Sequence, residues 1–424
     1  MQNTTFSPCA KMFLGRSVRV AGLSLFLAAT GARAEQSLSL REALEMADRR
    51  SPAMLLAERS VREAAAKKVG AGVVTSGHPK LSIEARPPIT QGTLGDIGYG
   101  GMFDMMFEVG GAPSARVREA GAGVAVAEGE KEGARVEARR DVYEAYVEGV
   151  IAESRVEQKR SALEIAEKVL DASRKREASG ASGEIDVSAS LVEKNQGSVA
   201  VLSAQADRER SIGRLRLLLD LEPAETGLQL TSKLGAPPAL PDVKVLLASA
   251  FEKRPELKIV AARLRQATAT ESRLRRENAP KLGFYLGVDA APVSPIFGMV
   301  GATIEWPLFQ RNQAALAGVS EQKQTEDLRA VVLRRSIETE VRTAMELFRN
   351  RTDQLRLLSV EVVPAARRTL ELVEAGWTAG RFDIFRLTTA AREYSRAREL
   401  ELDALRSVWI DRLRVMHLVG DITE

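Results

Sequence analysis

The sequence predicts a mainly α-helical protein with a small β part, in which a unit of helix, strand, strand, long helix and helix occurs twice. Two long stretches, about 113–178 and 312–376, repeat apolar residues every seven positions. In the second stretch the series runs through Val341, Phe348, Leu355 and Val362. This period is typical of helices that pack lengthwise against other helices. Helices of this length reach roughly 95 Å, which indicates an elongated molecule.

Residues 1–34 have the features of a secretory signal peptide. Lys11, Arg16 and Arg19 precede a short apolar run at 20–30, and a small-x-small site follows at 32–34. A membrane anchor is less favoured, because the run has about 11 residues and spanning needs about 20. Four of the 61 Lys and Arg residues lie in this segment, which has no acid, so the remainder balances the 57 acidic residues. Nucleic acid is therefore not an expected partner.

Cysteine usage limits the covalent chemistry of the mature chain. Cys9 is the only cysteine and leaves with the signal segment. We therefore expect no disulfide, no thiolate metal site and no lipid attached to a mature N-terminal cysteine.

The first repeat is expected over 35–221. Pro52 restarts a helix after a short one, and Pro79 precedes an alternating segment in which Leu81 and Ile83 share a face. Small residues at 179–183 break the helical pattern. The expected elements are helices at 39–49 and 53–69, strands at about 80–87 and 98–109, a long helix at about 113–178 and a helix at 184–221.

A proline-rich linker at 222–241 separates this half from a second repeat at 242–424. Five short matches recur in the same order with offsets from 197 to 203, which indicates an internal duplication. In one of them Gly183 and Asp186 correspond to Gly380 and Asp383. The second repeat is expected to have strands at about 281–290 and 298–307 and a long helix at about 312–376.

The strand count predicts assembly. No segment after the signal has 18 consecutive apolar residues, so an exported chain is periplasmic, secreted or an outer-membrane β-barrel. Four strands cannot close a barrel, and lipid does not tolerate open edges. Three copies supply twelve strands, an even number within the range of outer-membrane barrels. We therefore expect a homotrimer in contact with outer-membrane lipid.

Several motifs make the chain resemble a known family. Lys253-Arg-Pro-Glu-Leu257, Trp306-Pro-Leu-Phe309 and the turns at Gly183 and Gly380 look like those of the outer-membrane efflux proteins, the TolC-like family. The resemblance covers about 35–424 and leans toward the heavy-metal-efflux branch. It implies a trimeric 12-stranded barrel continued by a long periplasmic α-helical barrel. It also implies a passive exit duct, served by a periplasmic adaptor and an inner-membrane pump.

The resemblance also supplies the candidate site. It implies that an adaptor contacts the periplasmic tip at Gly183, Asp186, Gly380 and Asp383. The alternative is that these acids only favour helix starts, where the helix dipole is positive. The chain departs from the family in two places. The segment 109–113 lacks the aromatic-Pro-Leu strand end, and Arg386 and Thr389 stand where the family has an acidic ring.

Two sets of residues in the strands have alternative interpretations. Met102, Met105 and Met106 could contact a soft metal, but contact with lipid or packing is the favoured interpretation. Six aromatic residues are candidates for the girdles of a barrel or for the core of a soluble sheet: Tyr99, Phe103, Phe107, Phe284, Tyr285 and Trp306.

No catalytic, cofactor-binding or metal-binding residues are predicted, and we do not expect an enzyme. The mature chain has only His78 and His417, and it lacks HExxH, GxSxG and P-loop motifs. The cargo of a duct is not readable from its wall, so metal ions, drugs and proteins all stay open. The alternative function is a soluble periplasmic coiled-coil adaptor or structural scaffold.

Overall fold

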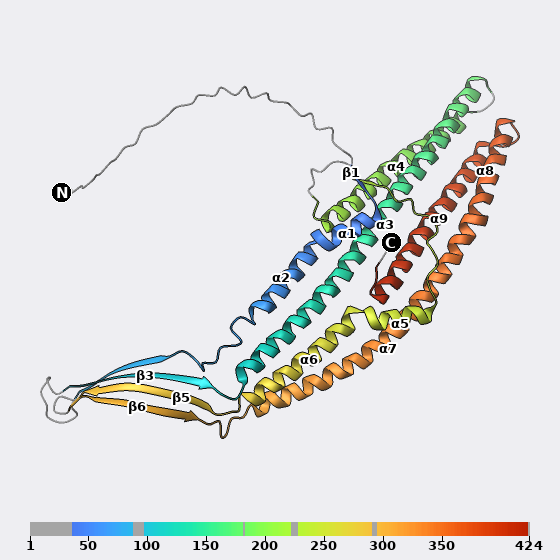
Figure 1. Ribbon diagram of the computed structural model, residues 1–424. Coiled ribbons are helices and arrows are strands. Elements are labelled where there is room, and N and C mark those ends of the chain that lie inside the picture. The colour runs from blue at the N-terminus through green and yellow to red at the C-terminus, as the bar shows by residue number, and fades with distance from the viewer. Residues whose placement is uncertain (1–35, 88–96, 181–182, 222–227, 291–294, 423–424) are drawn as a thin grey trace, which may run out of the picture.

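The protein is an elongated molecule with a four-stranded sheet at one end and helices that run to the other end (Figure 1). This computed structural model describes residues 36–87, 97–180, 183–221, 228–290 and 295–422. The predicted signal peptide lies outside the described residues, as does most of the loop between the first two predicted strands. The prediction of a mainly helical fold with a small β part is confirmed.

The elements follow the predicted order in both halves. The first half contains β1 (Gln36–Leu38), α1 (Leu40–Arg50), α2 (Pro52–Ala66), β2 (Lys80–Arg86), β3 (Gly98–Glu108), α3 (Ala112–Ala178) and α4 (Glu184–Leu218). β4 (Leu228–Leu230) lies in the segment between the halves, and the second half contains α5 (Val243–Lys253), α6 (Pro255–Arg276), β5 (Lys281–Ala290), β6 (Phe297–Glu305), α7 (Gln313–Leu357), α8 (Val363–Thr378) and α9 (Ile384–Val419). A π-helical turn, η2 (Leu358–Val362), joins α7 to α8.

Local sequence sets several helix starts. Ser39 and Glu42 form a capping box on α1, in which each side chain accepts a hydrogen bond from the other residue's backbone N–H. Pro52 and Pro255 open α2 and α6, where their fixed φ suits the first turn. Gly111 is the N-cap of α3 and has φ +74°, a backbone conformation that residues with a side chain rarely adopt. The glycine therefore lies at the point where the first strand pair ends and α3 begins.

The two long helices differ. α3 is unbroken over 67 residues, whereas η2 interrupts the corresponding helix. Pro364 lacks an N–H, and its ring excludes the carbonyl four residues earlier, so the regular helix cannot continue through it. The long helix expected at about 312–376 therefore has two α-helical parts joined by a π-helical turn.

The π-helical turn also shifts the buried heptad stripe by one residue. Val341, Phe348 and Leu355 are buried with the predicted spacing, but the next member, Val362, is exposed. Burial resumes one residue later with the same period of seven, at Val363, Leu370 and Trp377. An inserted residue in the helix rotates all later side chains, so the stripe moves with it.

The proline-rich segment is more than a linker. β4 pairs in parallel with β1, with Leu38 opposite Leu230. Tyr146 on α3 donates a hydrogen bond to the Leu38 carbonyl at 2.9 Å, and the Trp409 Nε1–H on α9 donates to the Gly235 carbonyl at 2.8 Å. Residues 228–235, here called the crossing segment, therefore bind the two halves together.

Two apolar clusters hold the helices beside this crossing. The first joins α1, α3, α4 and α9 around the fully buried Tyr143 and Tyr146. The second joins α5, α7 and α9 around Ile337, Val341 and Val408. The core therefore lies in the middle of the rod and leaves the sheet at one end and the hairpin turns at the other.

Candidate functional site

The α3–α4 and α8–α9 hairpins end beside each other, at the end of the molecule opposite the sheet (Figure 1). Each first helix stops at a glycine with φ +75°, Gly180 in one hairpin and Gly380 in the other. The Gly180 N–H donates to the Glu177 carbonyl at 2.8 Å, and the Gly380 N–H donates to the Trp377 carbonyl at 2.9 Å. Glycine suits both positions because it adopts a left-handed backbone without steric cost.

The structure changes the alignment of the two turns. Gly183 is the N-cap of α4, and Asp383 is the N-cap of α9. Gly183 therefore corresponds to Asp383, and Asp186 corresponds to Arg386. The sequence match of Gly183 with Gly380 is three residues out, because short glycine-containing turns can be matched in more than one register.

The four predicted tip residues lie at one end of the rod but have different local roles. The Asp383 carboxylate accepts a hydrogen bond from the Arg386 N–H at 2.9 Å, which caps α9. Asp186 lies in the first turn of α4, where the helix dipole favours a negative charge. Gly183 faces open space. Adaptor contact at Gly183, Asp186, Gly380 and Asp383 stays a prediction.

The hairpins are bonded to each other just below the turns. Arg176 on α3 donates from Nη1 to the Trp377 carbonyl at 3.0 Å, and its guanidinium lies 5.6 Å from the Trp377 ring centroid. Trp377 is buried with Ile384 and Leu387 of α9. These contacts join residues about 200 positions apart, which sequence reasoning did not detect.

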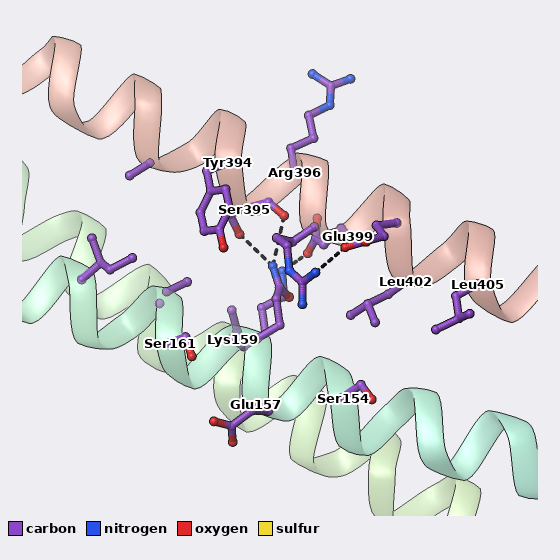
Figure 2. A pocket seen from close by; sticks show the side chains of 18 of the residues that line it. Ser154, Glu157, Lys159, Ser161, Tyr394, Ser395, Arg396, Glu399, Leu402 and Leu405 are labelled. Carbon is purple, nitrogen blue, oxygen red and sulfur yellow. Dashed lines mark hydrogen bonds and ion pairs between the residues drawn. The ribbon is translucent and has the colours of Figure 1, made fainter. Parts of the chain in front are cut away.

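Below this contact a cavity of about 1210 Å³ separates the hairpins. α3, α4, α9, the end of α7 with η2, and the crossing segment line it. We call it the inter-hairpin groove. Figure 2 shows side chains from α3 and α9 that meet across it, including Lys159, Ser395 and Glu399.

Polar bonds bridge the inter-hairpin groove. The Gln158 side-chain amide donates to the carbonyl and hydroxyl oxygens of Ser395, both at 3.1 Å. The ion pairs that join the hairpins are Lys159–Glu399, Arg155–Asp403 and Glu193–Arg392. The hydrogen bond and charge of Glu193 raise the pKa of Arg392, so the charged form of this guanidinium is stabilised.

At the other end, the sheet is antiparallel in the order β2-β3-β5-β6 and has two unlike faces. One face is apolar yet exposed, with Ile83 at 82% and Val300 at 81% exposure. Its larger side chains include Ile83, Phe103, Phe107, Phe284, Leu286 and Val300. The opposite face carries Ser82, Glu84, Arg86, Asp104, Asp289 and Thr303. Such a sheet fits a boundary between lipid and water.

The strand register sorts the aromatic and methionine candidates. Tyr99, Phe103, Phe107 and Phe284 lie on the apolar face, and Trp306 follows β6. Tyr285 lies on the polar face, where its ring covers Gly301.

The three methionines are divided between the two faces of the sheet. Met105 lies on the apolar face, but Met102 and Met106 lie on the polar face. Strand side chains alternate between faces, so three methionines within five positions could not all face lipid.

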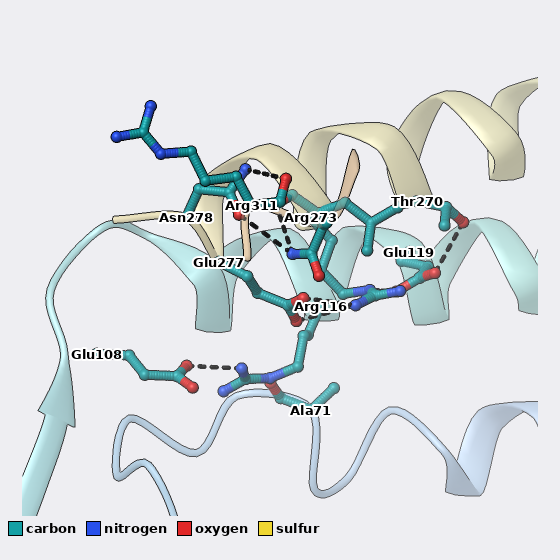
Figure 3. Close-up of polar contacts among 11 residues, drawn as sticks. Ala71, Glu108, Arg116, Glu119, Thr270, Arg273, Glu277, Asn278 and Arg311 are labelled. Carbon is teal, nitrogen blue, oxygen red and sulfur yellow. Dashed lines mark hydrogen bonds and ion pairs between the residues drawn. The ribbon is translucent and has the colours of Figure 1, made fainter. Parts of the chain in front are cut away.

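A polar collar fixes the sheet to the helices (Figure 3). Arg116 on α3 donates to Glu108 Oε2 at 2.6 Å and to the carbonyls of Ala71 and Val73 at 3.2 and 2.7 Å. Arg273 on α6 donates to Glu119 Oε2 at 2.5 Å and pairs with Glu277. The arginine bonds connect both halves, so the sheet has a defined orientation on the rod.

No helix among the described residues has both the length and the apolar character to cross a bilayer. Within the same residues, no group of three or more His, Cys, Asp or Glu side chains could hold a metal ion.

Comparison with known proteins supplies the family. The family model described as "Outer membrane efflux protein" matches residues 246–421. The chain is also similar to the cobalt-zinc-cadmium resistance protein CzcC of Cupriavidus metallidurans, with 23% identity over 316 residues, 74% of this chain and 75% of the relative. The outer-membrane channel OprN has the same fold, with a TM-score of 0.74, 19% identity and 90% of each chain covered. The outer-membrane channel CmeC of Campylobacter jejuni gives 0.74 at 14% identity, covering 90% of this chain and 85% of CmeC.

Residues 246–421 thus match the outer-membrane efflux proteins, and the chain has the fold of outer-membrane channels. The resemblance derived from the sequence is thereby confirmed, together with the outer membrane as the location. The matched family is one of outer-membrane efflux proteins, and OprN and CmeC are outer-membrane channels.

Proposed function

We propose that three copies of the chain form one continuous duct, whose twelve-stranded barrel crosses the outer membrane and whose helices form a tunnel in the periplasm. The observation that carries this proposal is the sheet, which has two edge strands, β2 and β6, and an exposed apolar face. Edge strands in lipid leave backbone groups without hydrogen bonds, which costs several kcal/mol for each group.

Pairing β6 of one subunit with β2 of the next satisfies both edges. The four strands alternate in direction, so this new pair is also antiparallel and the barrel contains an even number of strands. In the closed barrel the apolar face points to lipid and the face with Glu84, Arg86 and Asp289 points to water.

A crosslinking experiment tests this closure. The sequence has no cysteine after residue 34. Ser82→Cys on β2 and Thr303→Cys on β6 therefore introduce the only thiols into the signal-free chain. A short bis-maleimide should then yield covalent dimers and trimers in outer-membrane fractions, with no larger species. Ser82→Cys alone is the matched control and should remain monomeric after denaturation.

The outcome also separates the channel from the alternative of a soluble scaffold. Recovery from the periplasm without detergent, or crosslinked ladders that continue beyond trimer, would contradict the proposed duct.

We place the gate of the duct at the tip and the inter-hairpin groove. A periplasmic adaptor that contacts Gly183, Asp186, Gly380 and Asp383 would open it by moving the α8–α9 hairpin away from the α3–α4 hairpin. This motion breaks the bonds that cross the inter-hairpin groove. An inner-membrane pump supplies the energy, and the duct itself carries cargo without chemistry.

Channel recordings in planar bilayers test the gate. Glu193→Arg places two like charges at the Glu193–Arg392 contact and should raise the conductance of the resting channel. Adding Arg392→Glu restores an ion pair of reversed polarity and should return the conductance to the starting value. Glu164→Arg changes an exposed pair with Lys168 within α3 and serves as the control. Equal conductance in all variants would remove this contact from the gate.

For the cargo, we propose the heavy-metal branch of the family. The name of the relative CzcC, which specifies cobalt, zinc and cadmium resistance, supports this branch. Arg386 and Thr389 occupy the positions of the family's acidic ring, so we expect any cation contact to lie elsewhere in the duct.

A further inference from the structure

Two methionines on the polar face of the sheet flank a glycine. Met102 on β3 and Met299 on β6 both lie opposite Gly287 on β5, one on each side. A Cβ at Gly287 would lie 3.4 Å from the Met299 methyl carbon and 3.6 Å from the Met102 Cα. The Met299 side chain therefore extends over the glycine toward the strand that carries Met102.

Glycines leave room for these side chains. Met106 is on the same face as Met102, and its sulfur would lie 3.4 Å from a Cβ at Gly283. Because Gly283 and Gly287 have no side chains, β5 leaves space on this face for the methionine thioethers to lie across the strand. Met102 and Met299 are nonetheless 36% and 38% exposed, so their side chains are accessible from the water side.

Burial does not account for this pair. The same face carries Ser82, Asp104 and the Arg86–Asp289 ion pair at 3.0 Å, as expected of a surface in contact with water. Apolar side chains could instead have been placed on the opposite face, where Met105 lies. What methionine adds to a wet surface is a soft sulfur donor that needs no deprotonation.

We infer that Met102 and Met299 form a binding site for a soft monovalent metal cation, Cu⁺ or its redox-stable analogue Ag⁺. Thioethers select such ions over the harder divalent cations of the first transition row. Two sulfur ligands without a charged partner bind weakly, and weak binding permits an ion to enter and leave a conducting path. The position of the site inside the duct rests on the proposed trimer, whereas the two ligands belong to one sheet of one subunit.

Methyl NMR tests this site directly. The signal-free chain, labelled with [¹³C-methyl]methionine and held in lipid nanodiscs, is titrated with silver nitrate in chloride-free buffer. The Met102 and Met299 methyl signals should shift with Ag⁺, and the Met105 signal should stay in place. Zn²⁺ and Co²⁺ nitrate should leave the Met102 and Met299 signals unchanged.

Leucine variants provide the matched controls. Met102→Leu and Met299→Leu each remove one sulfur at nearly constant volume, and each should abolish the Ag⁺-dependent shift of the remaining partner. Met105→Leu should leave both shifts intact. No shift at millimolar Ag⁺, equal shifts at all methionines, or a shift that survives the single variants would each overturn the inference.

A separate crosslinking sample, kept free of Ag⁺, distinguishes this inference from the proposed duct. Crosslinking of the Ser82→Cys and Thr303→Cys pair reports trimer formation independently of metal. A trimer without an Ag⁺ response rejects the methionine site and keeps the duct, whereas loss of the trimer rejects the duct.

Discussion

The two halves of the chain have the same order of elements but differ in how they are built. α3 is one unbroken helix, whereas its counterpart contains η2 and Pro364. α4 starts at a glycine without a capping side chain, whereas α9 starts at Asp383, which caps it. The duplicated unit therefore keeps its architecture while helix regularity and capping change independently.

The position of η2 gives this difference a structural meaning. Leu355 and Ser359 line the inter-hairpin groove next to the π-helical turn, while the opposite wall is the regular α3. π-helical turns are irregular points in a helix and occur frequently at functional sites. The second half thus contains a helix irregularity at a position where the first half has a continuous helix.

The largest predicted effect comes from placing the second half's proline in the first half. Counted back from Gly180 and Gly380, Pro364 corresponds to Glu164, which lies inside α3. Glu164→Pro should lower the free energy of unfolding by about 3 kcal/mol or more, because it removes a helix hydrogen bond and introduces a clash. Glu164→Ala should have a much smaller effect, since it removes only an exposed ion pair.

Denaturant unfolding of the detergent-solubilised protein measures both variants, and Pro364→Ala completes the comparison. We expect Pro364→Ala to change stability by less than about 1 kcal/mol, because η2 already accommodates the ring. If Pro364→Ala lowered the free energy of unfolding as much as Glu164→Pro does, η2 would not be a local adaptation to the proline ring.

A second prediction concerns how the helices before the strands are attached. Asp48 on α1 accepts bonds from Arg135 and Arg139 of α3 at 2.6 to 3.1 Å, whereas α5 is attached to α7 through Leu246, Leu247 and Ala250. Burial opposes ionisation of Asp48, but the hydrogen bonds and charges of the two arginines outweigh it and lower its pKa.

The sign of the pH effect follows from this lowered pKa. The stabilisation is complete above the ordinary carboxyl range and is lost as pH falls through the lower pKa of the folded state. Asp48→Asn should cost about 2 kcal/mol at pH 7 and should flatten the loss of stability on acidification. Asp353→Asn, on an exposed face of α7, is the control. An unchanged acid profile in Asp48→Asn would contradict the assignment.

The third prediction removes the cap that only the second half has. Asp383→Ala should destabilise the start of α9 by about 1 kcal/mol, because the Arg386 N–H loses its acceptor. Hydrogen–deuterium exchange at the first turn of α9 should become faster. Asp186→Ala, which lies within α4 rather than at its cap, should have a smaller effect, and equal effects would refute the difference between the turns.

The smallest predicted effect is the reverse change. Gly183 has an extended backbone, and no atom lies within 4 Å of the position that a Cβ would take there, so an aspartate fits. Gly183→Asp should stabilise the first turn of α4 by only a few tenths of a kcal/mol, since glycine is itself a tolerated cap. Slower amide exchange confined to this turn is the expected result, and faster exchange would contradict it.

Much of the fold could be predicted because its signals are local and periodic. Pro52, Pro79 and Pro280 mark element boundaries, alternation marks the strands, and the heptads mark the long helices. The parallel pairing of β1 with β4 could not be predicted, because each has three residues and they lie about 190 positions apart. The sequence does contain a signal for the one-residue shift of the buried stripe at η2, because Pro364 and Trp377 do not fit the seven-residue series that precedes them.

The candidate site was less predictable, because it depends on contacts between distant segments. Glycine and aspartate identified the turns, but the cap geometry was needed to align Gly183 with Asp383. The bonds between the hairpins, such as that of Arg176 with Trp377, involve residues that resemble ordinary helix-surface residues in the sequence. The sheet face of each methionine could be assigned only from the strand register. Side chains alternate between the two faces, so a register error of one residue would assign each methionine to the opposite face.

The free edges of β2 and β6 also constrain how the protein is made. A newly exported subunit presents two strands that can pair with any compatible chain, including the wrong one. Association and membrane insertion therefore have to be coupled, since a subunit that lingers alone is a substrate for aggregation or proteolysis. For the proposed trimer, the quantity of active channel in a cell should rise with the rate at which three subunits meet, and more steeply than the rate of synthesis.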